Sequence, residues 1–293
     1  MSGSKITEQQ NSRSHQIDTL SIQEILQLIN SEDALVAAAV QATIPEITNF
    51  VEKVVLRFQI GGKLFYVGSG TSGRLGILDA AEIPPTYSAD PMLVQGIIAG
   101  GYNALVKSVE GAEDIPEDGA KAVEEFGITE KDVLLGITAS SSTPFVLGAL
   151  EEAHNMGATT GLLICNRPPQ LNWIDHIIPI ITGPEIITGS TRMKAGTATK
   201  LALNMITTTA MIKLNKTYGN LMVDLKASNN KLWDRGTRII QQLTSLNYEK
   251  ARILLESAQG EVKAALVMHK KNTSFGEAKT LLEENEGKLR NIL

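Results

Sequence analysis

The sequence predicts an α/β protein: a doubly wound, mostly parallel sheet in three layers, with N-terminal helices and a small C-terminal helical domain. Two observations lead to this fold class. Short apolar runs typical of buried parallel strands recur through the middle of the chain, and helical patterns separate them. Strands that alternate with helices are typical of parallel sheets covered on both faces.

The first 50 residues are expected to form a flexible arm followed by helices. The first 18 residues are polar and rich in Ser and Gln, which favours the arm. Ser21 and Glu24 then have the spacing of a capping box ahead of an apolar stripe. A second helix is expected over residues 32–43, and a third begins at Pro45.

The central residues, 51–220, carry the strand pattern. The five expected strands cover residues 63–68, 94–99, 132–138, 160–165 and 176–180. Helices are expected over residues 73–82, 102–110, 116–126, 144–156 and 197–213. From residue 221 only amphipathic helical patterns remain, and Ser274 with Glu277 repeats the capping box. The expected domains are therefore residues 1–50, 51–220 and 221–293.

Composition excludes several classes of protein. The chain has 293 residues, 27 Lys and Arg against 32 Asp and Glu, one Cys and four His. One cysteine rules out a disulfide within the chain and a Cys-rich zinc site. A net charge of −5 disfavours nucleic acid as a partner. The N-terminal stretch has neither a membrane-spanning apolar run nor the apolar core of a secretory signal, so we expect a cytoplasmic protein without a membrane partner.

The loop after the first expected strand has the composition of a phosphate-binding turn. Residues 68–74 are Gly-Ser-Gly-Thr-Ser-Gly-Arg, so glycines let the backbone approach an anion while Thr71 and Ser72 offer hydroxyls. The following helix adds free N–H groups at its N-terminus. The loop lacks the lysine of a P-loop and the spacing of a dinucleotide-binding loop. A tight turn without a ligand is the alternative.

A second hydroxyl-rich loop follows the third expected strand. Residues 139–144 include Ser140, Ser142 and Thr143, and Pro144 suits the first turn of the next helix. Parallel sheets bind ligands beyond the carboxyl ends of their strands. Two such loops at one edge fit a single phosphorylated small molecule better than two unrelated turns.

Carboxylates and one lysine complete the candidate site. Glu82 lies at the end of the first loop's helix, where the pair Pro84-Pro85 is expected to stop that helix. Glu113 lies in an acidic cluster whose alternative explanation is a solvated face or helix cap. Two carboxylates on one ligand supply a general acid and a general base. Lys194, before the long helix, either complements an anionic substrate or is simply exposed.

Several motifs together resemble one enzyme family. They are residues 68–76 (GSGTSGRLG), 81–86 (AEIPPT), 98–101 (IAGG), 109–114 (VEGAED), 189–197 (GSTRMKAGT) and 219–224 (GNLMVD). In this order they resemble the N-acetylmuramic acid 6-phosphate etherases, and the resemblance covers nearly the whole chain.

The resemblance implies a sugar isomerase (SIS) domain, a homodimer, and no metal or organic cofactor. It implies cleavage of the D-lactyl ether of N-acetylmuramic acid 6-phosphate with water, giving N-acetylglucosamine 6-phosphate and D-lactate, in cell-wall sugar recycling. By motif, Glu82 is the proton donor and Glu113 the second catalytic residue. Ser72, Ser140 and Thr143 are implied to hold the phosphate. Thr71, Ser142 and Lys194 are further candidates for contacts with the substrate.

One loop departs from the family pattern, in which Gly-Arg stands where this chain has Ser141-Ser142. Helix geometry adds a second expectation, because ten residues of helix place Glu82 about 15 Å from Ser72. We therefore expect each site to be completed across the dimer, with Glu82 supplied by the partner subunit. The open alternatives are an aldose-ketose isomerase, a noncatalytic sugar-phosphate sensor and a protein-binding regulator.

Overall fold

The computed structural model describes residues 5–227 and 229–293. The chain divides into two compact units, and two long helices run from one into the other. The first unit comprises the residues up to Ala81 together with Pro91–Thr207, and the second comprises Glu82–Asp90 and Thr208–Leu293. The N-terminal helices therefore belong to the first unit.

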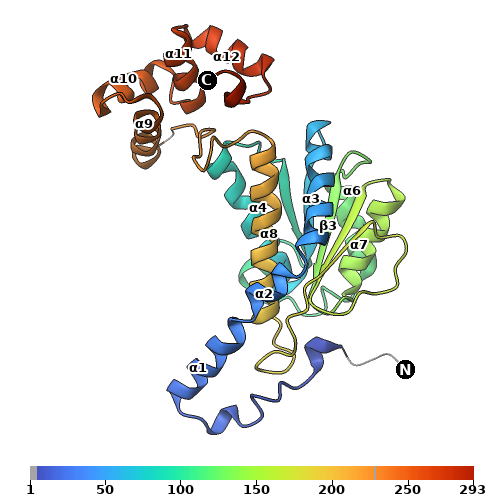
Figure 1. Cartoon of the computed structure of the whole chain (residues 1–293). Helices are drawn as coiled ribbons and strands as arrows, with labels where there is room; N and C mark the ends of the chain where they lie inside the picture. Colours follow the sequence, from blue (N-terminus) through green and yellow to red (C-terminus); the bar gives the residue numbers. More distant parts are fainter. Residues whose placement is uncertain (1–4, 228) are drawn as a thin grey trace. The chain divides into compact units, whose positions relative to one another are not determined.

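A five-stranded parallel sheet forms the centre of the first unit, which confirms the expected fold class (Figure 1). The strands are β1 (Leu64–Gly68), β2 (Val94–Ile98), β3 (Val133–Thr138), β4 (Thr159–Ile164) and β5 (His176–Pro179). Their order is β2-β1-β3-β4-β5. Every residue of β1, β3 and β4 is buried, as their apolar sequences predict. Since β1 pairs with β3, the loops that follow them are neighbours.

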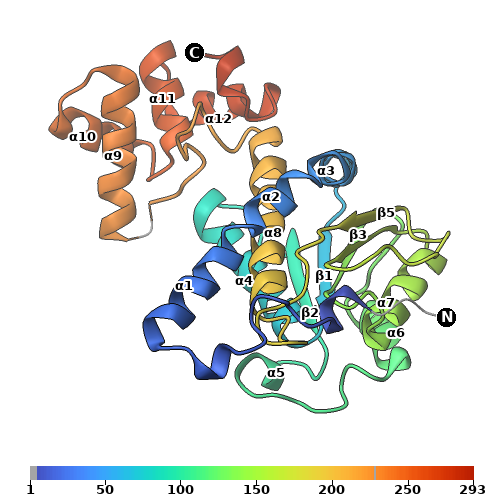
Figure 2. The same ribbon diagram turned by 60° about the horizontal axis from the view of Figure 1, so that its bottom comes forward.

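Helices cover both faces of the sheet. The helices up to residue 213 are α1 (Ile22–Asp33), α2 (Val36–Gln41), α3 (Ile44–Gln59), α4 (Gly70–Tyr87), α5 (Asn103–Val106), α6 (Pro116–Glu125), α7 (Pro144–Asn155) and α8 (Lys194–Lys213). Both views place α6 and α7 on one side of the sheet and α4 and α8 on the other (Figures 1 and 2). On the α6–α7 side, Phe65, Leu134 and Leu162 of the strands share one apolar core with Val146 and Leu150 of α7.

Three helices differ from the sequence expectation. Helix α4 does not stop at Pro84-Pro85 but continues to Tyr87, although each proline removes one backbone hydrogen bond of the helix. Helix α5 is much shorter than residues 102–110. Helix α8 begins three residues earlier than expected, because the Glu185 carboxylate accepts hydrogen bonds from the backbone N–H of Lys194 (3.0 Å) and Ala195 (2.9 Å).

The described part of the N-terminal arm is packed against the first unit, although its polar composition suggested a flexible segment. Thr7 and Asn11 are buried. The Asn11 amide donates to the Glu32 carboxylate of α1 at 2.8 Å, and the backbone N–H of Ile6 donates to the Asn166 side chain at 3.2 Å. These hydrogen bonds hold the arm, and they leave no periodic pattern in the sequence.

The C-terminal residues of the second unit form a helical cluster with its own core. Its helices are α9 (Asn230–Thr244), α10 (Tyr248–Ser257), α11 (Val262–Lys271) and α12 (Phe275–Glu284). Helix α11 is central, since Ala264, Ala265, Leu266 and Val267 are all buried. The capping boxes expected at Ser21 and Ser274 are both present.

No single helix within residues 5–227 and 229–293 is long and apolar enough to cross a membrane. The segments Ile22–Gln41 and Ile44–Gln59 pass a length and composition test only as a pair, across a bend of 57°.

Candidate active site

A pocket of about 420 Å³ lies where β1 and β3 end. Its lining residues are Lys5, Glu8, Ser69, Gly70, Thr71, Ser72, Glu113, Asp114, Thr138, Ala139, Ser140, Ser142, Thr143, Pro144, Gly189 and Thr191. The structure thus brings together six of the eight residues singled out from the sequence. These are Thr71, Ser72, Glu113, Ser140, Ser142 and Thr143.

The β1 loop is a tight turn that leads directly into α4. A side chain at Gly73 would place its Cβ 2.6 Å from the Ile98 side chain and 2.7 Å from the backbone oxygen of Gly68, so only glycine fits there. Because α4 begins at Gly70, Thr71 and Ser72 lie in its first turn. The unpaired N–H groups of that turn and the helix dipole favour an anion at this end of the pocket.

The β3 loop forms a cluster of hydroxyls. The hydroxyls of Thr138 and Thr143 are 2.7 Å apart, and Ser140 lies 3.4 Å from both Thr138 and Ser142. Ser141 has a φ of 64°, the left-handed conformation that glycine adopts most easily. The loop therefore keeps a glycine-like backbone with serine in the glycine's place.

Glu113 enters the pocket from the segment between α5 and α6. Its carboxylate accepts a 2.6 Å hydrogen bond from the Ser69 hydroxyl of the β1 loop. Its backbone oxygen accepts from the N–H of Phe145 at 3.0 Å, in the first turn of α7. These two contacts fix the carboxylate between the loops while leaving it exposed enough to reach a ligand.

The other two candidate residues are not among the lining residues. Glu82 is exposed on α4, ten residues and about 15 Å of helix beyond Ser72. Lys194 is buried, and its ammonium donates to the Glu32 carboxylate at 2.6 Å. We therefore correct the expectation that Lys194 contacts substrate, because its charge is already neutralised inside the protein.

Glu32 receives three donors at this buried position. Besides Lys194, the Asn11 amide and the Arg13 guanidinium each donate to it at 2.8 Å. Burial alone would raise the pKa of the Glu32 carboxyl, but the hydrogen bonds from Lys194 and Asn11 and the charges of Lys194 and Arg13 together lower it. Glu32 therefore stays ionised and ties the arm to the start of α8.

Sequence reasoning missed the wall of the pocket that the N-terminal arm supplies. Lys5 and Glu8 both line the pocket, and the backbone N–H of Gly189 donates to the backbone oxygen of Thr7 at 3.2 Å. Ser69, Asp114 and Thr191 were also missed. The Gly-Ser-Thr run at 189–191 was the available sequence signal for this wall.

Comparisons with known proteins match segments in both units of the chain. The family model described as "Glucokinase regulatory protein N-terminal SIS domain" matches residues 46–154, and "C-terminal lid domain of glucokinase regulatory protein" matches residues 219–263. A protein of Salinibacter ruber named N-acetylmuramic acid 6-phosphate etherase is 49% identical over 97% of this chain and 92% of its own length. The chain belongs to the N-acetylmuramic acid 6-phosphate etherase family.

A second etherase-named relative, from Nostoc sp., is 50% identical over 98% of this chain and 94% of its own length. Both units of the chain thus fall within what the etherase family shares. The solved phosphoheptose isomerase of Neisseria gonorrhoeae is 15% identical, covers 65% of this chain and 98% of its own, and has a TM-score of 0.49. The SIS domain is therefore assigned from the family model that spans both loops and Glu113.

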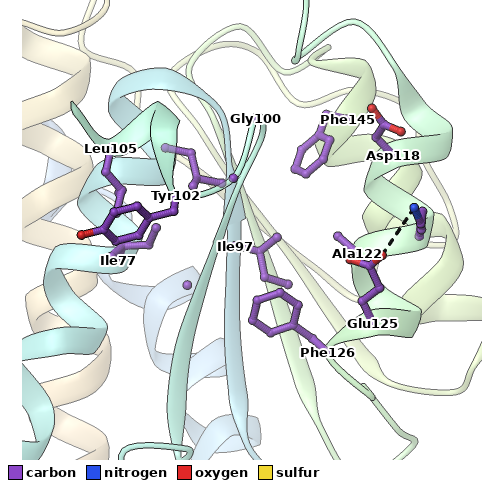
Figure 3. A pocket seen from close by; sticks show the side chains of 14 residues that line it. Ile77, Ile97, Gly100, Tyr102, Leu105, Asp118, Ala122, Glu125, Phe126 and Phe145 are labelled. Carbon is purple, nitrogen blue, oxygen red and sulfur yellow. Dashed lines mark ion pairs between the residues drawn. The ribbon is translucent and has the colours of Figure 1, made fainter. Parts of the chain in front are cut away.

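A second, larger pocket does not have the chemistry that this family's substrate requires. It measures about 570 Å³ and surrounds the edge strand β2, with Ile77 and Tyr102 on one side and Phe126 and Phe145 on the other (Figure 3). The described residues of its lining include no Ser or Thr, and the charged ones are Asp118, Lys121 and Glu125. The hydroxyl-lined pocket is the better etherase site. In the described residues no cluster of three or more His, Cys, Asp or Glu could hold a metal ion.

Proposed function

We propose that this chain cleaves the D-lactyl ether of N-acetylmuramic acid 6-phosphate, forming N-acetylglucosamine 6-phosphate and D-lactate during cell-wall amino-sugar recycling. One observation carries the proposal: a chain almost half identical to etherases over nearly its full length places two hydroxyl loops and Glu113 in one pocket. Phosphorylated sugars do not cross membranes unaided, so the cytoplasm fits as the place of action.

The hydroxyl loops account for the phosphate end of the substrate. Ser72, Ser140 and Thr143 line the pocket, as do Thr71 and Ser142. Hydroxyls and helix N–H groups match phosphate oxygens, which accept several hydrogen bonds at once. This grip orients the sugar so that the carbons near its reducing end approach Glu113.

The reaction requires a base and an acid. In the ring-opened sugar the C2 proton is acidified by the C1 aldehyde. Removal of that proton by Glu113 forms a C2–C3 double bond, the C3–O bond breaks, and its electron pair leaves with the lactyl oxygen, which takes a proton from an acid. Water then adds to C3 while a proton returns to C2, so the sum of the steps is one hydrolysis.

Glu82 is our candidate for the acid, acting from a partner subunit in a homodimer. Its position on the exposed surface of α4, about 15 Å of helix from Ser72, supports this arrangement. Mixed Glu82→Gln and Glu113→Gln subunits test it. When the two variants are mixed in equal amounts, about half of the dimers contain one subunit of each kind. If the site is shared between subunits, one of the two sites in each mixed dimer has both glutamates, so about 25% of wild-type activity returns. Activity that stays at the level of the separate variants would place Glu82 in its own subunit's site.

Incubation with N-acetylmuramic acid 6-phosphate tests the function itself. We expect D-lactate and N-acetylglucosamine 6-phosphate in equal amounts, with Glu113→Gln at least about 100-fold slower, the usual contribution of a general base. The matched control is Glu110→Gln, which changes an exposed carboxylate of the same segment that does not line the pocket. Isomerisation of hexose 6-phosphates without lactate release would favour the isomerase alternative.

A further inference from the structure

The charge of the pocket is unusual for a site that receives an anion. Among the residues that the structure describes, its lining carries three carboxylates, those of Glu8, Glu113 and Asp114, and a single ammonium, that of Lys5. Since the proposed substrate brings a phosphate dianion and a lactyl carboxylate, repulsion from three carboxylates disfavours its binding. The phosphate therefore needs a positive charge, and Lys5 is the lining residue that carries one.

Lys5 lies beside the hydroxyls of the β3 loop, which belong to the proposed phosphate site. Its ammonium donates to the Ser142 hydroxyl at 2.6 Å, across 137 positions of sequence. Ser142 is 3.4 Å from Ser140, so the ammonium belongs to the hydroxyl cluster of the β3 loop. The two helix N-termini that border the pocket, those of α4 and α7, contribute only partial charges, which a full positive charge complements.

The arm that carries Lys5 is held by hydrogen bonds to residues that lie far away in the sequence. Directly after Lys5, the backbone N–H of Ile6 donates to Asn166 at 3.2 Å, and Thr7 accepts from Gly189. Further along, Asn11 is held by the buried Glu32. These anchors limit the volume that the Lys5 side chain can sample, which reduces the entropy lost when it grips a ligand.

We propose that Lys5 is a substrate-binding residue that pairs with the 6-phosphate from the N-terminal arm. This inference rests on the proposed function for the identity of the phosphorylated sugar. In this proposal the N-terminal arm supplies the positive charge that opposes the phosphate, which the two hydroxyl loops alone do not provide. Lys5 is assigned to binding and not to proton transfer, since it lies at the phosphate end, away from the reacting C2 and C3 carbons.

Steady-state kinetics of Lys5→Met and Lys5→Arg test the proposal, with Lys131→Met as the matched control. Lys131 is exposed at the opposite end of β3, outside the pocket lining. We expect Lys5→Met to raise KM about 10-fold or more with kcat nearly unchanged, the loss that one charge-assisted hydrogen bond predicts. Lys5→Arg recovers most of that loss because it keeps the charge, and Lys131→Met behaves as wild type.

Binding of the product separates this inference from the proposed function. Calorimetry with N-acetylglucosamine 6-phosphate needs no turnover, so it tests Lys5 even if no lactate is released. We expect Lys5→Met to weaken binding of the phosphorylated sugar about 10-fold and to leave the affinity for unphosphorylated N-acetylglucosamine unchanged. Equal affinities for the phosphorylated sugar in Lys5→Met and Lys131→Met would overturn the proposal, as would a loss of kcat with KM unchanged.

Discussion

The buried pair Glu32–Lys194 gives the sharpest stability prediction. Their charged atoms are 2.6 Å apart, and the two side chains are only 5% and 3% exposed. Removing one partner of such a pair leaves an uncompensated buried charge, which costs about 3–5 kcal/mol. Glu32→Ala should therefore lower the free energy of unfolding of the first unit by that amount.

The two single variants should differ. Lys194→Met leaves Glu32 with the hydrogen bonds from Asn11 and Arg13, so it should cost less than Glu32→Ala. The double variant should lose at least about 1 kcal/mol less than the sum of the two single losses, because the buried charges are coupled. The exposed pair Lys121–Glu125, drawn in Figure 3, serves as the control, and Glu125→Ala should cost less than about 1 kcal/mol.

Urea unfolding followed by tryptophan fluorescence measures these changes. The chain has two tryptophans, Trp173 in the first unit and Trp233 in the second. A Trp233→Phe background leaves Trp173 as the reporter of the unit that contains the pair. A loss below about 1 kcal/mol for Glu32→Ala, with additive single and double variants, would refute the buried-pair reasoning.

Three further predictions concern pH and backbone. The pKa of the Glu32 carboxyl is lowered in the folded protein, so its contribution to stability is present above the unfolded pKa of about 4.3. That contribution is lost as the pH falls through the folded pKa, and urea unfolding at a series of pH values from 7 to 3 measures the loss. Ser141→Gly should stabilise the first unit by up to about 1 kcal/mol and Ser141→Val should destabilise it, since φ is 64°; thermal melts that rank the two in reverse would contradict this. Gly148→Ala should cost at least about 1–3 kcal/mol, because its Cβ would meet the Pro116 backbone oxygen, whereas Gly276→Ala, with nothing within 4 Å, should cost nothing measurable in the same melts.

Local signals predicted most of the fold. The strands are short, mostly apolar runs, so the sequence locates all five to within a few residues. Both capping boxes form because their hydrogen bonds join residues three apart. The same locality explains why the β1 and β3 loops and Glu113 could be named as site residues, since each follows an element that the sequence marks.

Long-range polar contacts could not be predicted. Lys5 meets Ser142 across 137 positions, and Lys194 meets Glu32 across 162. Such pairs join single polar side chains and leave no periodic pattern, so the arm was expected to be flexible and Lys194 was expected at the substrate. The expected helix stop at Pro84-Pro85 was also wrong, since α4 continues through both prolines to Tyr87 despite the two backbone hydrogen bonds that they remove.

A single experiment in labelled water tests the central claim, elimination of lactate followed by addition of water to the sugar. The protein is incubated with N-acetylmuramic acid 6-phosphate in H₂¹⁸O, and both products are analysed by mass spectrometry. We predict D-lactate without the label and N-acetylglucosamine 6-phosphate with one ¹⁸O at C3. Absence of lactate would contradict the proposed function, and ¹⁸O in the lactate would show that its own C–O bond breaks, contradicting the mechanism.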